Sequence, residues 1–325
     1  MLRTQAERFG NRVALVHENS RITYGELERR SAALARGLVA NGVGKASRVA
    51  LLIPNGVEFV VTLFGVVRAG AVAVGVNTFY KERELAWTLR HCDAQQLVCA
   101  PSFLSNDYVA RLESALPDLK AATSNDLFLE GAPYLRRIHV WGVADRRWAS
   151  DAADLERGTL VSSAAFEAVE AEVHPADLAV LVYTSGSTAD PRGALHSHGT
   201  LVRQTWNLAA RMPLAPDDVL YNPSPFFWIG GLTMGLLVAL HQGAALAGQN
   251  RFEAGAALRF LQDERVTVAM GWPHFGAAMA SHPDRPATDL SALRGGNLHE
   301  LLDPARRPPR GDRRSNALGM TETAG

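Results

Sequence analysis

The chain has 325 residues, of which 47% are hydrophobic and 20% are charged, a composition typical of globular proteins with a sizeable core. Lys plus Arg equals Asp plus Glu at 33 each, so the formal net charge is +0. This balance argues against nucleic acid or an anionic membrane surface as the partner.

Three further features favour a soluble, cytoplasmic protein. Cys92 and Cys99 match no metal-binding or redox spacing and can form at most one disulfide. Glu7 places a charge where a secretory signal would carry its apolar stretch. The longest uncharged apolar run, residues 225–240, is shorter than a bilayer span and contains three glycines. We therefore expect no transmembrane segment, and the sequence leaves peripheral membrane contact open.

Short apolar runs alternate with helical patterns through most of the chain. The predicted strands cover residues 49–53, 71–74, 96–99, 138–141, 178–183, 219–221, 244–246 and 266–270. Helical patterns cover residues 57–68 and 82–90, and a further helix begins after Thr23, where Thr23 and Glu26 form a capping box. Gly42 ends that helix. The alternation predicts an α/β fold of layered, mostly parallel sheets flanked by helices.

The mixed, acidic stretch of residues 154–175 is interpreted as a connection between two lobes, residues 1–172 and residues 173–325. Near the end, residues 304–314 hold three prolines and five arginines. A solvated loop is favoured there over a basic surface for a partner.

The most informative segment follows the predicted strand of residues 178–183 and combines hydroxyls, glycines and one cation. It reads Thr184-Ser185-Gly186-Ser187-Thr188-Ala189-Asp190-Pro191-Arg192-Gly193. Small residues let the backbone approach a ligand, hydroxyls add donors, and the guanidinium of Arg192 suits phosphate oxygens. The segment predicts a site for a nucleotide triphosphate tail, with a plain polar surface loop as the alternative.

Two other motifs are excluded at this segment. It lacks the Gly-Lys-Ser/Thr ending of the common P-loop. It also lacks the Gly-x-Ser-x-Gly elbow of serine hydrolases, although Ser185 and Ser187 flank Gly186.

The segment resembles the signature loop of the adenylate-forming superfamily, Tyr-Thr-Ser-Gly-Thr/Ser-Thr-Gly-x-Pro-Lys-Gly. Ala189 replaces a glycine of that pattern, and Arg192 replaces its lysine. Residues 22–27 and 68–72 are similar to early structural segments of the same superfamily. The likeness runs from Val13 to Glu322 and implies the large N-terminal domain of an acyl-CoA synthetase or fatty-acid–CoA ligase, incomplete at its C-terminus.

The resemblance also implies an acyl pocket and an adenine site. The acyl pocket would include Phe227, Trp228 and Gly231 within residues 223–231, where aromatic side chains of a plain core are the alternative. The residues implied for adenine are Gly295, Gly296, Asn297, Asn316, Leu318 and Gly319. Leu318 departs from the family pattern, because an aromatic ring usually stacks on adenine there.

By the same resemblance, Thr321 and Glu322 would be catalytic, with Thr321 on the α-phosphate and Glu322 holding Mg²⁺. Thr184 to Thr188 and Arg192 would bind the β- and γ-phosphates. The implied reaction joins a carboxylic acid to AMP and then to coenzyme A, so ATP, Mg²⁺ and coenzyme A are the expected cofactors.

Relatives continue past this point to a ribose-binding aspartate, a hinge and a small C-terminal lid domain with a lysine. None of these can be located in the chain, so we expect it to catalyse little by itself. The alternative function is a non-catalytic nucleotide-binding remnant or scaffold with the same fold.

Overall fold

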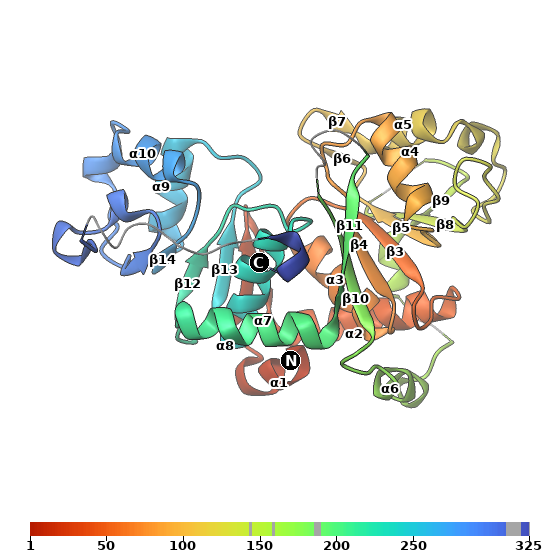
Figure 1. Cartoon of the computed structure of the whole chain (residues 1–325), viewed down its shortest axis with the longest axis horizontal. Helices are drawn as coiled ribbons and strands as arrows, with labels where there is room; N and C mark the ends of the chain where they lie inside the picture. The colour runs from red at the N-terminus through yellow and green to blue at the C-terminus, as the bar shows by residue number, and fades with distance from the viewer. Residues whose placement is uncertain (143–144, 158–159, 185–189, 310–319, 325) are drawn as a thin grey trace. The chain divides into compact units, whose positions relative to one another are not determined.

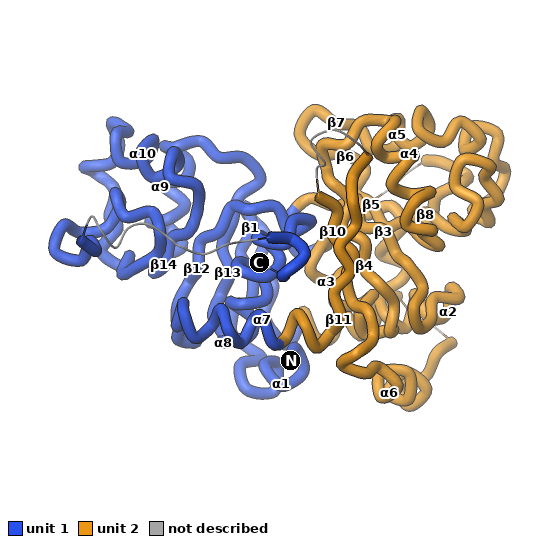
Figure 2. Tube along the Cα trace, viewed as in Figure 1, with its two compact units in different colours: residues 1–26, 55–57, 203–325 blue, residues 27–54, 58–202 orange. Residues whose placement is uncertain are grey.

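The computed structural model describes residues 1–142, 145–157, 160–184, 190–309 and 320–324. The chain divides into two compact units (Figures 1 and 2). Unit 1 comprises residues 1–26, 55–57 and 203–325, and unit 2 comprises residues 27–54 and 58–202. Each unit contains its own large sheet.

Unit 2 holds a seven-stranded sheet in the order β11-β10-β4-β3-β5-β8-β9. Its strands are β3 (Arg48–Leu52), β4 (Val72–Gly75), β5 (Gln96–Cys99), β8 (Arg137–Val140), β9 (Ala149–Asp151), β10 (Leu178–Thr184) and β11 (Arg192–Ser197). All neighbours pair in parallel except β10 and β11, which form an antiparallel edge. A small hairpin, β6 (Ser102–Phe103) with β7 (Asn106–Asp107), lies outside this sheet.

The helices of unit 2 are most of α2 (Tyr24–Ala40) and α3 (Val57–Arg68), with α4 (Glu82–His91), α5 (Tyr108–Ala115) and α6 (Ser163–Ala171). Every residue of β5 is buried, as parallel strands covered on both faces require. Leu85 of α4 and Leu112 of α5 belong to the same buried cluster as Val74 and Leu97 of the sheet. The core of unit 2 therefore includes the packing of α4 and α5 against the central strands.

Unit 1 holds a six-stranded sheet in the order β15-β14-β12-β13-β1-β2. Its strands are β1 (Val13–His17), β2 (Ser20–Thr23), β12 (Val219–Tyr221), β13 (Ala245–Gly248), β14 (Val268–Ala269) and β15 (Gly295–Gly296). Only β2 is antiparallel to its neighbour. The helices are α1 (Leu2–Phe9), most of α7 (His198–Arg211), the π-helix η3 (Gly230–Leu237), α8 (Val238–Gln242), α9 (Ala254–Asp263) and α10 (Pro273–Ala280).

The structure confirms the predicted α/β fold of mostly parallel sheets flanked by helices. The capping box before α2 is also present: the backbone N–H of Thr23 donates to Glu26 Oε2 at 3.0 Å, and that of Glu26 donates to Thr23 Oγ1 at 3.2 Å. Gly42 follows α2 with φ 82°, the left-handed conformation of a helix-ending glycine. The strands that were not predicted are β1, β2, β6, β7, β9, β11 and β15.

The compact units have other bounds than the predicted lobes 1–172 and 173–325. The N-terminal strand β1 pairs in parallel with β13, with Leu15 opposite Leu246, so the chain's first residues belong to unit 1. Residues 154–175 belong entirely to unit 2. The lobes remain a prediction about functional domains.

Cys92 and Cys99 are free and buried, and burial raises the pKa of both thiols to about 12. Neither thiol is therefore a reactive thiolate at neutral pH. No helix in the described ranges is long and apolar enough to cross a membrane.

Arg68, at the end of α3, joins three helices of unit 2. Its Nε donates to Glu170 Oε1 of α6 at 2.6 Å, and its Nη2 donates to Glu28 Oε1 of α2 at 2.8 Å. Its Nη1 donates to the carbonyl oxygen of Glu28 and to Ser31 Oγ. The guanidinium also lies 5.8 Å from the centre of the Phe166 ring. Only 12% of the Arg68 side chain is exposed, so α6 is held on unit 2 by a largely desolvated ion pair.

We predict that Arg68→Met lowers the free energy of unfolding by about 2–4 kcal/mol, because two half-buried carboxylates lose their partner. Urea denaturation measures the change. The control is Arg157→Met, which removes an ion pair to Asp154 whose side chains are 68% and 58% exposed. The control is expected to cost less than about 1 kcal/mol. Equal losses for the two variants would contradict the role given to Arg68.

Candidate functional site

The predicted site residues fall in both units, and some of them cannot be placed. Ser185, Gly186, Ser187, Thr188, Asn316, Leu318 and Gly319 lie outside the described residues, as does Ala189. The remaining predicted residues belong to four local structures, one in unit 2 and three in unit 1.

In unit 2, the β10–β11 hairpin contains the two ends of the predicted phosphate loop (Figure 1). Thr184 is the last residue of β10 and pairs with Arg192, the first residue of β11. Thr184 Oγ1 also donates to the carbonyl oxygen of Arg192 at 3.3 Å. The Arg192 side chain is exposed. The hairpin thus places a hydroxyl and a cation opposite each other where the predicted loop leaves the sheet.

In unit 1, the predicted acyl-pocket segment is held by two asparagines that the sequence reasoning missed. Asn55 Nδ2 donates to the carbonyl oxygen of Ser224 at 2.9 Å, and Asn55 Oδ1 accepts the backbone N–H of Phe226 at 2.7 Å. Asn222 Oδ1 accepts the backbone N–H of Ser224 at 2.9 Å. Asn55 is far from this segment in sequence, so no local sequence pattern predicts its hydrogen bonds with Ser224 and Phe226.

The three predicted pocket residues differ in their surroundings. Phe227 is 4% exposed, while Trp228 is 43% exposed, and their rings meet edge to face with centres 5.4 Å apart. Gly231, in η3, lies against backbone: a Cβ at this position would stand 2.1 Å from the carbonyl oxygen of Pro225. Phe227 is therefore as buried as a core residue. Of the two aromatic side chains, that of Trp228 is the one exposed to a ligand. The acyl pocket itself remains a prediction.

We predict that Gly231→Ala lowers the free energy of unfolding by about 3 kcal/mol or more, because backbone atoms must move to admit the methyl group. The matched control is its neighbour, Gly230→Ala. A Cβ on Gly230 meets nothing within 4 Å, so this change is expected to be neutral or to stabilise by up to about 1 kcal/mol. Thermal and urea denaturation of both variants test the contrast, and a similar loss in both would refute it.

The predicted adenine turn includes β15, the edge strand of the sheet of unit 1, which pairs with β14. Gly295 and Gly296 form β15, and Gly296 has φ 112°, with a Cβ position only 1.9 Å from the carbonyl oxygen of Ala269. Asn297 Oδ1 accepts the backbone N–H of Gly271 at 2.9 Å, and Asn297 Nδ2 donates to the carbonyl oxygen of Gly271 at 2.9 Å. The amide of Asn297 therefore continues the pairing of β14 with β15 beyond the last backbone hydrogen bonds.

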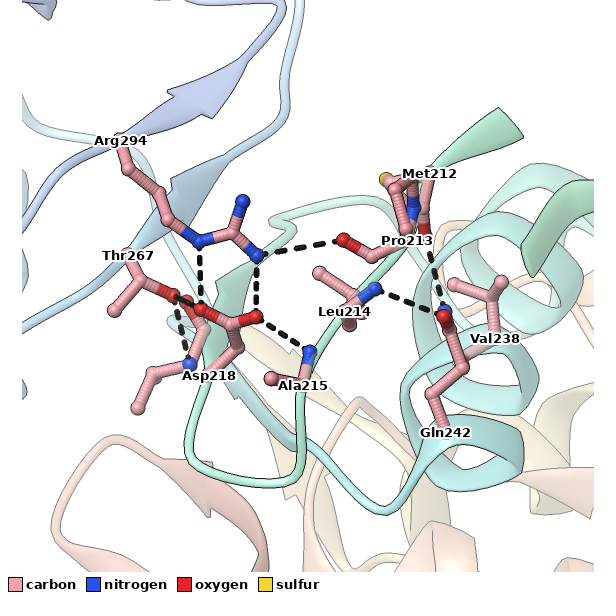
Figure 3. A network of polar contacts seen from close by, with 10 residues as sticks. Met212, Pro213, Leu214, Ala215, Asp218, Val238, Gln242, Thr267 and Arg294 are labelled. Carbon is pink, nitrogen blue, oxygen red and sulfur yellow. Dashed lines mark hydrogen bonds and ion pairs between the residues drawn. The ribbon is translucent and has the colours of Figure 1, made fainter. Parts of the chain in front are cut away.

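An ion pair at the opposite end of the same strands holds β15 in the sheet (Figure 3). Arg294, next to Gly295, donates through Nε to Asp218 Oδ1 at 2.9 Å and through Nη2 to Asp218 Oδ2. Thr267 Oγ1 donates to Asp218 Oδ1 at 2.7 Å, and the backbone N–H of Ala215 donates to Oδ2 at 2.6 Å. Four donors thus surround one buried carboxylate.

Burial alone would raise the pKa of Asp218, but the hydrogen bonds from Arg294, Thr267 and Ala215 outweigh it and hold the pKa below its usual value. A carboxyl whose pKa is lowered by folding stabilises the folded state above its unfolded-state pKa, about 3.9. That contribution is lost as the pH falls through the lower, folded-state pKa.

We therefore predict that the difference in unfolding free energy between the native chain and Asp218→Asn is largest at neutral pH and shrinks as the pH falls below 4. Urea denaturation at pH 7, 5 and 3 measures it. Asp263→Asn, at an exposed end of α9, is the control and should change stability little. A difference that stays constant across this range would rule out the stabilising role of the Asp218 charge.

Thr321 and Glu322 begin a short 3₁₀ helix, η8 (Thr321–Thr323), and the Glu322 side chain is exposed. Within the described ranges, no group of three or more His, Cys, Asp or Glu side chains could hold a metal ion. Mg²⁺ is commonly bound by one or two carboxylates together with substrate phosphates, so a single exposed Glu322 fits a cation that arrives with a nucleotide.

The chain matches the AMP-binding enzyme family over residues 2–325. It belongs to this family. Acyl-CoA ligase SID4 of Ajellomyces capsulatus is 32% identical over 306 residues, which are 93% of this chain and 50% of the ligase. Feruloyl-CoA synthase of an Amycolatopsis species is 32% identical over 288 residues, which are 86% of this chain and 50% of the synthase.

Solved structures show the same fold. The N-terminal domain of FACL13 from Mycobacterium tuberculosis matches with a TM-score of 0.76 and 23% identity, covering 92% of this chain and 71% of that domain. The anthranilate CoA ligase AuaEII, solved with anthranoyl-AMP, matches with a TM-score of 0.76 and 22% identity over 92% of this chain and 56% of the ligase. The chain spans about half the length of the curated relatives it matches.

Proposed function

We propose that this chain is the nucleotide- and acid-binding part of an AMP-forming acid–CoA ligase acting on an apolar, fatty-type carboxylic acid. The observation that carries the proposal is the family match over residues 2–325, together with relatives named as acyl-CoA ligase and feruloyl-CoA synthase. The pairing of Thr184 with Arg192 supports it, because it brings a hydroxyl and a cation to the ends of the phosphate-loop segment.

The proposed reaction has two steps. An oxygen of the substrate carboxylate attacks the α-phosphorus of ATP, and the bond to the β-phosphate oxygen breaks, releasing pyrophosphate and leaving an acyl-adenylate. The sulfur of coenzyme A then attacks the acyl carbon as its thiol proton leaves, and AMP departs with its bonding electron pair. Both steps depend on positioning and on stabilising charge at the phosphates more than on covalent work by the protein.

The residue roles follow from the resemblance to adenylate-forming enzymes, and the charge and hydrogen-bonding groups of each side chain agree with them. Arg192 and the hydroxyl of Thr184, with Ser185 to Thr188, bind the β- and γ-phosphates in this proposal, and Thr321 binds the α-phosphate. Glu322 would hold Mg²⁺, which neutralises phosphate charge when bound. Trp228 offers an apolar face to the acid, and Gly295 to Asn297 with Asn316, Leu318 and Gly319 line adenine.

We predict that Arg192→Gln weakens ATP binding about tenfold or more, because a charge-assisted contact to phosphate is lost. Isothermal titration with Mg²⁺–ATP measures the change in Kd. Arg157→Gln, another exposed arginine of unit 2, is the control and should leave the Kd unchanged. An unchanged Kd in Arg192→Gln would contradict the assignment of the phosphate loop.

ATP–pyrophosphate exchange with a panel of fatty and aromatic acids separates the two functions left open by the sequence. Acid-dependent exchange that falls in Arg192→Gln supports the ligase. ATP binding without exchange for any acid would instead support a nucleotide-binding scaffold. This outcome decides the question only for a protein as long as the relatives. For the 325-residue chain by itself we expect weak exchange, because it spans about half the length of the ligases it resembles.

A further inference from the structure

One face of α4 lies against the hairpin that carries the phosphate loop. Arg83, Trp87 and His91 are spaced four residues apart, so their side chains share one side of the helix. Each of the three contacts a residue of the segment between β10 and β11 or of β10 itself. Nothing in the sequence motifs or in the proposed reaction uses these three side chains.

The last turn of α4 contacts the residue just before the loop. His91 Nδ1 lies 2.8 Å from the hydroxyl oxygen of Tyr183, and the rings meet at 66° with centres 5.8 Å apart. Tyr183 is 5% exposed, and burial raises the pKa of its phenol, so it remains a neutral hydroxyl that can share a proton with His91. This contact fixes the residue whose backbone leads directly into Thr184.

Trp87 contacts the rings of both His91 and Tyr183. Its indole stacks on His91, with centres 4.3 Å apart and planes 16° from parallel, and meets the edge of Tyr183 at 5.9 Å. Gly193 of β11 is the cross-strand partner of Tyr183. A Cβ on Gly193 would stand 2.7 Å from Leu181 Cδ1 and 3.5 Å from Tyr183 Cε1, so the glycine leaves the room that these side chains occupy. Tyr183 is thus enclosed by α4 and by β11.

The first turn of α4 contacts the other end of the loop. Arg83 Nη2 lies 3.4 Å from Asp190 Oδ1, and both side chains are well exposed. Asp190 is two residues from Arg192, so its carboxylate would repel a bound phosphate tail. The guanidinium of Arg83 offsets that charge, and because the pair is exposed its contribution is small and sensitive to salt.

We propose that this face of α4 positions the phosphate loop: His91 and Trp87 fix Tyr183 at the entry of the loop, and Arg83 balances Asp190 near its exit. These are positioning residues, because none of them needs to touch the nucleotide. The inference rests on the proposed function, since it assumes that the segment between Thr184 and Arg192 binds the triphosphate tail.

The test uses His91→Phe, which keeps a ring to stack on Trp87 and removes the contact with the Tyr183 hydroxyl. Binding of ATP, inorganic tripolyphosphate and AMP is measured by titration. We expect His91→Phe and Tyr183→Phe each to weaken ATP and tripolyphosphate about two- to tenfold, the range of one lost hydrogen bond, and to leave AMP unchanged. The double variant should bind ATP no more weakly than the weaker single variant, because both remove the same contact. His91→Gln, which can still reach the hydroxyl, should restore part of the affinity.

Tyr108→Phe is the matched control. Tyr108 is a buried tyrosine of the same unit, and its hydroxyl donates to the carbonyl oxygen of Thr78, a residue outside the hairpin, at 2.9 Å. It should lower Tm without changing the ratio of ATP to AMP affinity. An unchanged ATP affinity in His91→Phe, or an equal loss in Tyr108→Phe, overturns the inference. If the native chain binds neither ATP nor tripolyphosphate, the proposed function fails instead, and the two failures are told apart.

Discussion

The pairing of β10 with β11 is the interaction on which the two ends of the predicted phosphate loop depend. On one side β10 is a parallel strand locked to β4, with Val180 opposite Ala73 and Val182 opposite Gly75. On its other side β10 pairs with the antiparallel strand β11, so a short connection joins the two strands. Neighbouring parallel strands would need a long crossover. Both ends of the loop segment are therefore held by one edge of one sheet. The position of the two ends of the predicted phosphate loop is therefore determined by the mostly buried strand β10.

Arginine carries much of the fixed geometry in both units, although the chain has no net charge. Arg68 connects three helices of unit 2, and Arg294 holds β15 against Asp218 in unit 1. In each case the guanidinium makes several directed hydrogen bonds at once, which the single ammonium of lysine cannot reproduce. Desolvating such pairs offsets much of their attraction, so their main effect is to fix an arrangement, with net stability a lesser consequence.

Local patterns predicted the elements whose own residues determine them. The apolar runs of β3, β4 and β5 and the capping box of α2 are examples, because burial and end-capping act over a few neighbouring residues. Strand β11 was missed because its residues, Arg192 to Ser197, are mostly exposed or half-buried and lack a strand composition. The contacts of Asn55 with Ser224 and of His91 with Tyr183 join positions 169 and 92 residues apart, and only the fold brings them together. Motif resemblance supplied the predicted roles of Thr321 and Glu322, which the described geometry does not derive.

Asparagine side chains hydrogen-bond the backbone where segments of unit 1 depart from regular strands. A segment that leaves a sheet to meet a ligand must still satisfy its backbone donors and acceptors. A side-chain amide has one carbonyl oxygen that accepts and one NH2 group that donates. It can therefore take the place of a peptide group where no neighbouring strand supplies one. Asn297 does so for Gly271, and Asn55 does so for Ser224 and Phe226. Because Asn297 both accepts from and donates to the backbone of Gly271, its side chain maintains the shape of the turn that follows β15.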